Sequence, residues 1–173
     1  MIKKLFIKDF AIIRELNIPL KNGLTVITGE TGAGKSILVD GISLILGKRA
    51  DLSVNRDKSK KCIIEGVFDI GSYELKLLFE KNELDYETDT ILRREISSSG
   101  KSRAFINDSP VNLNQLSVIG SKIIDIHSQH QNIEVLNSEF QFNLLDLIGG
   151  NDTRIKKYKN LYIDYKSKSN ELN

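Results

Sequence analysis

The pattern of hydrophobic positions predicts a chain that begins with strands and ends in helices. Apolar residues between Leu5 and Ile18 suggest two short strands separated by a bend at Asp9-Phe10. The short apolar run at 24–27 is typical of a buried strand. We therefore expect a third, buried strand there.

A helix is expected over 37–46, after the glycine-rich segment that follows the third strand. Leu38, Ile42 and Ile45 recur at the spacing i, i+4, i+7, so they form one apolar face that would pack on a sheet. Gly47 follows the last periodic residue and is predicted to end this helix. The elements expected next are a strand over 62–68, an amphipathic helix over 73–82, a hairpin of strands 90–96 and 102–106, a short helix opened by Asn112 and Gln115, and a buried strand over 123–126.

Residues 138–173 are predicted to be helical. Ser138 and Gln141 form a second capping pattern ahead of an apolar helix, which Gly149-Gly150 would end. Beyond 150 the composition shifts to Lys, Asn and Ser. Residues spaced alternately by three and four positions form an a/d seam, namely Ile155, Tyr158, Tyr162, Tyr165, Ser169 and Leu172. We expect residues 151–173 to begin a coiled-coil helix, with a solitary amphipathic helix as the alternative.

Composition narrows the class of protein without assigning a function. The 173 residues carry a formal net charge of +2, so bulk charge does not indicate nucleic-acid binding. The one cysteine, Cys62, excludes an internal disulfide and fits a reducing compartment. No apolar run approaches the ~20 residues that span a bilayer, and no signal peptide is visible. We expect a cytoplasmic protein with no membrane partner.

The strongest chemical signal is a P-loop pattern between the third strand and its helix. It reads Gly29-Glu30-Thr31-Gly32-Ala33-Gly34-Lys35-Ser36. Glycines let backbone N–H groups approach a triphosphate, and the helix N-terminus favours its negative charge. Lys35 is expected to reach the β- and γ-phosphates of ATP, and the Ser36 hydroxyl to bind Mg²⁺. The alternative is a glycine-rich turn that fits the pattern by chance.

Several separated segments, in order, resemble the RecN family of bacterial DNA-repair ATPases, which belongs to the SMC/ABC class. They are Phe10-Ala11-Ile12-Ile13, residues 23–37 with the P-loop, Leu46 to Asp51, Leu92-Arg93-Arg94, Ser102 to Asn107, and Ile124 to His130. The resemblance implies an α/β fold of ABC/SMC type with a mixed β-sheet. Residues 1–150 would form the N-terminal lobe of the ATPase head, and a coiled coil would follow.

The resemblance also implies a function and partners. ATP binding would close two heads on one another, and hydrolysis would release them, during recombinational repair of double-strand breaks in DNA. The C-terminal lobe of the same protein, a second copy of it and recombination proteins would be partners, and the protein would associate with the nucleoid. The sequence contains no Leu-Ser-Gly-Gly signature and no apolar strand that ends in Asp-Glu. We therefore expect this chain alone to be nearly inactive.

Gln129 lies where the family has its Q-loop, whose glutamine helps to hold Mg²⁺ and senses the γ-phosphate. Ser128 stands where the family commonly has glycine, and Gln131 is the fallback. Without the resemblance, Gln129 would be an ordinary polar loop residue. His127 and His130 have a spacing that metal ligands use, but no cysteine or further histidine cluster completes a site.

Asp125 supports a competing hypothesis. An apolar strand that ends in aspartate resembles a Walker B segment, whose carboxylate helps to hold Mg²⁺. The chain would then be a self-contained P-loop kinase. Against this, only Ile123 and Ile124 precede Asp125, and Lys122 interrupts the run. A third hypothesis is a nucleotide-gated dimerisation module that does not hydrolyse ATP.

Basic residues offer further candidates. Arg49 or Arg56 could approach the phosphates, since related heads carry an arginine after the P-loop helix. Two basic clusters are either solvated faces or contacts to DNA phosphates. The first lies on the predicted hairpin (Arg93, Arg94, Lys101, Arg103). The second lies in the polar, charged segment 51–61, which is expected to be a loop (Lys58, Lys60, Lys61).

Overall fold

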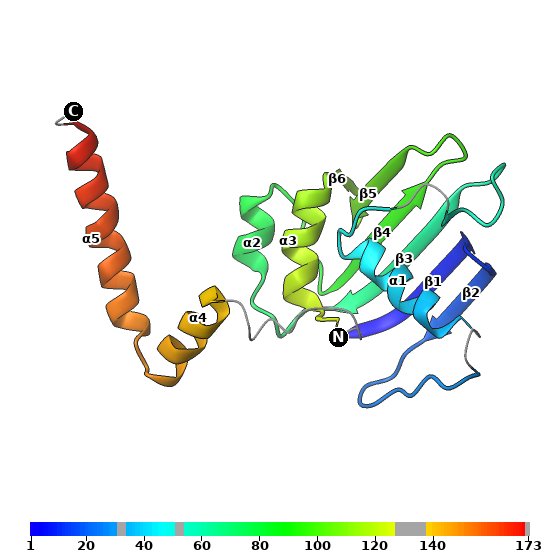
Figure 1. Cartoon of the computed structure of the whole chain (residues 1–173), viewed down its shortest axis with the longest axis horizontal. Helices are drawn as coiled ribbons and strands as arrows, with labels where there is room; N and C mark the ends of the chain where they lie inside the picture. The colour runs from blue at the N-terminus through cyan, green and yellow to red at the C-terminus, as the bar shows by residue number, and fades with distance from the viewer. Residues whose placement is uncertain (31–33, 51–53, 127–137, 172–173) are drawn as a thin grey trace. The chain divides into compact units, whose positions relative to one another are not determined.

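The computed structural model describes residues 1–30, 34–50, 54–126 and 138–171 (Figure 1). The chain divides into two compact units, Met1–Ile126 and His127–Asn173, and each is considered separately. The predicted lobe boundary at residue 150 remains a prediction.

A six-stranded sheet forms the framework of the first unit, with strand order β2-β1-β3-β4-β5-β6. The strands are β1 (Ile2–Phe10), β2 (Ile13–Pro19), β3 (Cys62–Asp69), β4 (Asp89–Ile96), β5 (Ser102–Ile106) and β6 (Ser109–Val111). Every pairing among these strands is antiparallel. The hairpin of β4 and β5 and the two N-terminal strands are confirmed, with the first turn at Ala11-Ile12, slightly later than expected.

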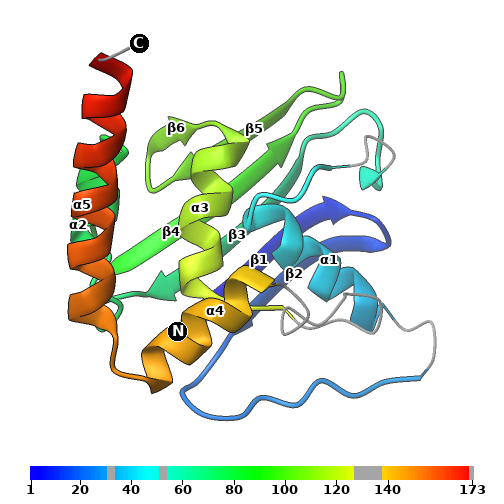
Figure 2. The same cartoon turned by 60° about the vertical axis from the view of Figure 1, so that its left-hand side comes forward.

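Helices α1 (Lys35–Ile45) and α3 (Leu113–Ile123) lie over one face of this sheet (Figures 1 and 2). As predicted, α1 begins at the P-loop lysine, and Gly47 follows its end with a φ of 95°. Helix α2 (Lys76–Lys81) is shorter than the predicted span of 73–82. The capping box of α3 is present, since Asn112 and Gln115 bond each other's backbone N–H groups at 2.9 and 3.1 Å.

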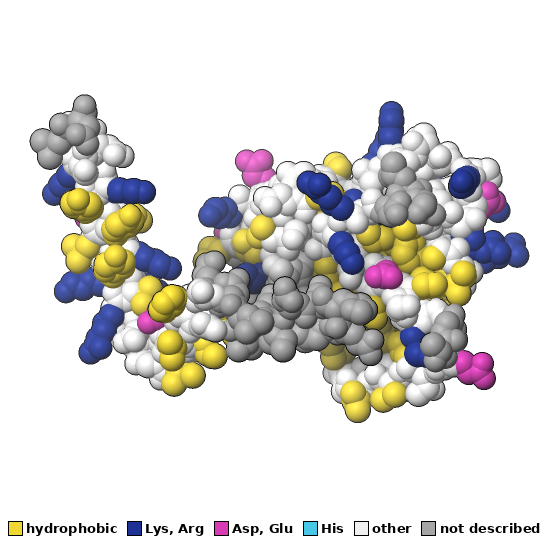
Figure 3. Space-filling model, viewed as in Figure 1, with side chains coloured by type: hydrophobic (Ala, Val, Ile, Leu, Met, Phe, Trp, Pro, Cys, Tyr) yellow, Lys and Arg dark blue, Asp and Glu magenta, His cyan; other side chains and the backbone are white. Residues whose placement is uncertain are grey.

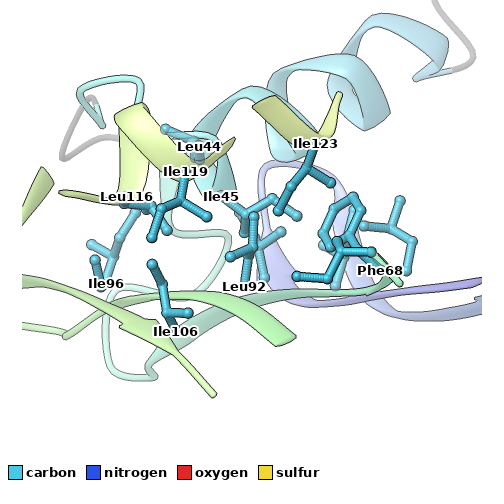
Figure 4. Close-up of a cluster of buried hydrophobic side chains, with 14 of the residues drawn as sticks. Leu44, Ile45, Phe68, Leu92, Ile96, Ile106, Leu116, Ile119 and Ile123 are labelled. Atoms are coloured by element: carbon cyan, nitrogen blue, oxygen red, sulfur yellow. The ribbon is translucent and has the colours of Figure 1, made fainter. Parts of the chain in front are cut away.

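The core fills the space between the sheet and the two helices. In β3 and β4 every second residue is buried, which is the period that places one set of side chains on one sheet face. Figure 4 shows these side chains meeting the apolar faces of the helices: Leu44 and Ile45 from α1, Phe68, Leu92, Ile96 and Ile106 from the strands, and Leu116, Ile119 and Ile123 from α3. Burial of each such side chain contributes about 1.5–3 kcal/mol.

The second unit contains α4 (Ser138–Ile148) and α5 (Asp152–Glu171), so both predicted helices are confirmed. Their apolar side chains are largely exposed, including Phe142, Leu147 and Ile148 on α4 and three seam tyrosines on α5, Tyr158, Tyr162 and Tyr165. Pairing of α5 into a coiled coil remains a prediction. None of the helices in the described ranges combines the length and apolar character that crossing a membrane requires.

Two predicted strands are wrong. Residues 24–27 belong to no strand, and Leu24 and Val26 are 92% and 70% exposed. This apolar run has no strand beside it among the described residues, and a strand forms only where a neighbour satisfies its backbone groups. Ile123 is the last residue of α3, and 124–126 continue without regular structure. The apolar spacing of α3 extends to Ile123, so the helical period prevails there.

Candidate nucleotide-binding site

The N-terminus of α1 carries the features that an anion site needs. Gly34 is the N-cap in the left-handed conformation, with a φ of 88°, and its carbonyl accepts the N–H of Ile37 at 3.1 Å. No side chain caps the helix, and its first turn contains no acidic residue. The first backbone N–H groups and the positive end of the helix dipole are therefore available to a negatively charged ligand.

Lys35 is held by the loop that precedes it. Its ammonium donates to the backbone carbonyl of Glu30 at 2.7 Å and to that of Gly29. No carboxylate of the described residues forms an ion pair with it. Neutral carbonyl groups thus hold the ammonium beside the helix N-terminus. Phosphate oxygens can replace these carbonyls and form charge-assisted hydrogen bonds with the ammonium.

Gly34 also lies close to a neighbouring side chain. A Cβ on this residue would lie 3.2 Å from the Cδ1 atom of Ile12, which belongs to the turn between β1 and β2. Ile12 is 64% exposed, so its side chain can shift by the few tenths of an ångström that a Cβ would need, and the positive φ is the stronger reason for glycine here. With an uncapped helix, a glycine at its start and a lysine beside it, the donor set fits a polyphosphate.

Not every predicted site residue can be placed. Gly29, Glu30, Gly34, Lys35 and Ser36 lie together at the start of α1, and the side chain of Ser36 is exposed there. The other predicted site residues lie outside the described residues: Thr31, Gly32, Ala33 and Gln129, together with His127, His130 and Gln131. For Mg²⁺ the described residue that fits is Ser36, because this ion commonly takes few protein ligands beside phosphate oxygens and water.

Of the two candidate arginines, Arg49 follows the C-terminal end of α1, whereas Lys35 begins this helix. Arg49 lines a cavity of about 270 Å³ along α1, together with Phe10, Asp40 and Lys48. Arg56 is exposed elsewhere, and its backbone N–H donates to the carbonyl of Asp9 at 3.0 Å. The approach of either arginine to the phosphates remains a prediction.

Asp125 does not end a strand. It is exposed and follows α3, so the apolar strand that a Walker B segment requires is missing at this position. The interpretation of the chain as a self-contained kinase with Asp125 as the metal ligand is therefore wrong.

The two basic clusters are partly neutralised. Arg93 stacks over Phe105 and lies 4.0 Å from Glu65 and 3.7 Å from Glu95. Lys61 pairs with Glu95 at 3.0 Å, and Lys60 with Asp57 at 3.3 Å.

The remaining members of the clusters differ in exposure. Arg94 is only 2% exposed, so it cannot reach DNA from solvent. Lys58, Lys101 and Arg103 are exposed. On the face seen in Figure 3, Lys and Arg side chains are dispersed among apolar and neutral ones.

Comparison with known proteins identifies the family. The family model described as an AAA domain matches residues 4–173. DNA repair protein RecN of Vibrio cholerae is 39% identical over 173 residues, which cover 99% of this chain and 31% of that protein. The chain thus spans about a third of the length of the curated relatives it matches.

Two solved structures share the fold. The Smc head domain with a coiled coil and joint from Pyrococcus yayanosii has a TM-score of 0.63 at 20% identity, over 98% of this chain and 36% of that one. A chain from work on ATP-driven dimerization and DNA-stimulated activation of SMC ATPases has a TM-score of 0.57 at 21% identity, over 82% of this chain and 89% of that one. The chain therefore belongs to the AAA domain family, and within it the chain is similar to DNA repair protein RecN and has the fold of the Smc heads.

Proposed function

We propose that this chain is the ATP-binding part of a RecN-like ATPase that acts on DNA in recombinational repair of double-strand breaks. Residues 29–36 bind the triphosphate. Lys35 neutralises the β- and γ-phosphates, and the Ser36 hydroxyl holds Mg²⁺, which supplies charge neutralisation when it is bound. Gln129 completes the Mg²⁺ shell and responds to the γ-phosphate.

The uncapped start of α1 carries this proposal. Helix α3 satisfies two of its N-terminal N–H groups with a capping box, whereas α1 begins with a glycine and a lysine and has no side-chain cap. Lys35 can exchange the carbonyls of Gly29 and Glu30 for phosphate oxygens. A helix start in this state gains more from an anion than one that is already capped.

The activity of the whole protein is assigned by analogy. The relatives are named for DNA repair, and one structure with this fold comes from work on ATP-driven dimerization of SMC ATPases. We infer that the C-terminal lobe supplies a signature segment and a catalytic glutamate. ATP would then be enclosed between two heads, and its hydrolysis would separate them. DNA, a second copy and recombination proteins are the proposed partners in a cytoplasmic, nucleoid-associated protein.

The binding step is tested on this chain by isothermal titration with ATP and Mg²⁺. We expect weak binding that falls at least tenfold in Lys35→Ala, because the charge on the β- and γ-phosphates is no longer compensated. Lys76→Ala, on the exposed start of α2, serves as the matched control and should bind as the wild type does. Robust ATP turnover by this chain that depends on Lys35 would contradict an active site divided between two lobes.

The alternative function, a nucleotide-gated dimerisation module that does not hydrolyse ATP, is tested on the full-length protein. ATPase rates with and without DNA separate the two functions. Hydrolysis that DNA stimulates supports the proposal. Nucleotide-dependent dimers that form without any hydrolysis would contradict the proposal and support the dimerisation module.

A further inference from the structure

Arg94 occupies an unusual position for a charged side chain. In β4 it alternates with Thr90, Leu92 and Ile96, which are all fully buried, and it is itself 2% exposed. Its neighbours in register are Ile64 on β3 and Ala104 on β5, both buried. The guanidinium therefore lies on the core face of the sheet.

Among the residues that the structure describes, no group compensates this charge. The Nε atom of Arg94 has no hydrogen-bond partner, and no carboxylate of the described residues forms an ion pair with the side chain. Glu65 and Glu95, the acids nearest in register, pair instead with Arg93 and Lys61. Burial lowers the pKa of Arg94, yet a guanidinium keeps its proton at neutral pH. Burying an unpaired charge costs free energy, and a negatively charged partner would offset this cost.

A cavity adjoins this arginine. It has a volume of about 600 Å³ and is lined by Arg94, Ser102, Ala104, Asn112 and Leu113 among others. It lies at the edge of the sheet, because β6 pairs with β5 only from Ala104 onward and leaves the backbone of Ser102 and Arg103 without a strand on that side. Ser102 and Arg103 are exposed, so the cavity meets solvent beside them, while Arg94 lies at its buried end.

The start of α3 supplies further donors to this cavity. The capping box satisfies the N–H groups of Asn112 and Gln115, the first and fourth of the helix start. The N–H groups of Leu113 and Asn114 have no helical carbonyl within reach, as in any α-helix. The helix dipole also favours negative charge at this end.

From this arrangement we propose that the cavity between β5 and the start of α3 is a binding site for a small oxyanion, a phosphate or carboxylate group, that pairs with Arg94. The planar guanidinium can bond two oxygens of either group at once. Ser102 and the first turn of α3 offer donors to the remaining oxygens. Ala104, Val111 and Leu113 would contact an apolar body that carries the anion.

This site is separate from the P-loop, so the inference does not rest on the proposed function. It involves β4, β5 and α3, whereas Lys35 and Ser36 belong to α1. Loss of one site should leave the other intact, so the two proposals can fail independently.

The test is a titration of the ¹⁵N-labelled chain with sodium phosphate, and separately with sodium acetate, at constant ionic strength. The wild type and Lys35→Ala are both measured, since the latter removes phosphate binding at the P-loop. We expect saturable shifts of the Leu113 and Ser102 amides and of the Arg94 Nε–H resonance, with the better of the two anions. The response should be unchanged in Lys35→Ala.

Arg94→Met tests the role of the buried charge. It replaces the aliphatic stem, removes the guanidinium and should weaken anion binding at least tenfold, whereas Arg93→Met, on the opposite face of the same strand, should bind as the wild type does. If Arg94→Met does not fold, the Arg94 Nε–H shift in the wild type decides. Shifts that grow linearly with both anions, or that persist in Arg94→Met, would overturn the proposal.

Discussion

Gly66 shows how tightly a single position in the sheet is specified. A Cβ on Gly66 would lie 2.7 Å from the Cδ1 atom of Ile45 and 2.7 Å from the Cε2 atom of Phe68, both part of the core in Figure 4. We expect Gly66→Ala to lower the free energy of unfolding by about 1–3 kcal/mol, the usual cost of overpacking. Urea denaturation measures this change.

The double variant Ile45→Val/Gly66→Ala is the control for the Gly66 prediction. Ile45→Val removes the Cδ1 atom that clashes, so the double variant should be more stable than the sum of the single effects predicts. Strict additivity would mean that the strain lies elsewhere.

The titration of the Cys62 thiol should make the free energy of unfolding depend on pH. The residue is fully buried, and burial followed by the charge of Asp9 raises the pKa of its thiol from 9.0 to about 12. Between these values the unfolded thiol has lost its proton while the folded one keeps it, so stability falls as pH rises, by up to about 1.4 kcal/mol per pH unit. Below about pH 9 both states are protonated and the effect vanishes.

The measurement compares urea unfolding of the wild type and Cys62→Ala between about pH 8 and pH 10. Cys62→Ala has no thiol to titrate. The difference in the free energy of unfolding between the wild type and this variant should therefore shrink only in the upper part of that range. A difference that stays constant with pH would contradict the raised pKa.

The P-loop pattern can be recognised from sequence because it depends on local spacing, and the roles of its residues remain predictions. The burial of Arg94 was missed, although a signal was present. Adjacent residues in a strand point to opposite faces. Grouping Arg93 with Arg94 as one basic cluster ignored this period. The sequence Thr90, Leu92, Arg94, Ile96 places Arg94 among core positions.

At the scale of elements, the capping box of α3 gives a direct test. Asn112→Ala removes the acceptor of the Gln115 N–H, so we expect a loss of about 1 kcal/mol in the free energy of unfolding. Asn114→Ala, one position beyond the first helical residue, is the matched control and should change stability little. Equal effects of the two substitutions in urea denaturation would argue against a capping role.

Elements with a local signal were predicted, and elements that depend on distant partners were not. The β4–β5 hairpin and α3 follow from alternation, a turn and a capping pair within a few residues. The error at 123–126 arose because a short apolar run fits a helix end as well as a strand. Residues 24–27 have the composition of a strand, but composition does not reveal whether a neighbouring strand exists.

The exposed segment 24–27 bears on how the full-length protein is folded around the P-loop. Exposed Leu24, Val26 and Ile27 leave an apolar run in water directly before the P-loop. The relatives are about three times as long as this chain. We propose that residues beyond this chain supply the strands that pair with 24–27, and so fix the entry to the nucleotide site.

Val26→Asp tests this proposal in two contexts. In this chain Val26 is 70% exposed, so the free energy of unfolding should change by no more than about 0.5 kcal/mol. In the full-length protein the carboxylate would be buried in a sheet without a partner, which costs several kcal/mol. The full-length variant should therefore lose ATPase activity and unfold at a lower urea concentration. Lys21→Asp, also exposed before the same segment, should leave both proteins unchanged. A small effect of Val26→Asp in both contexts would show that the segment stays exposed in the whole protein.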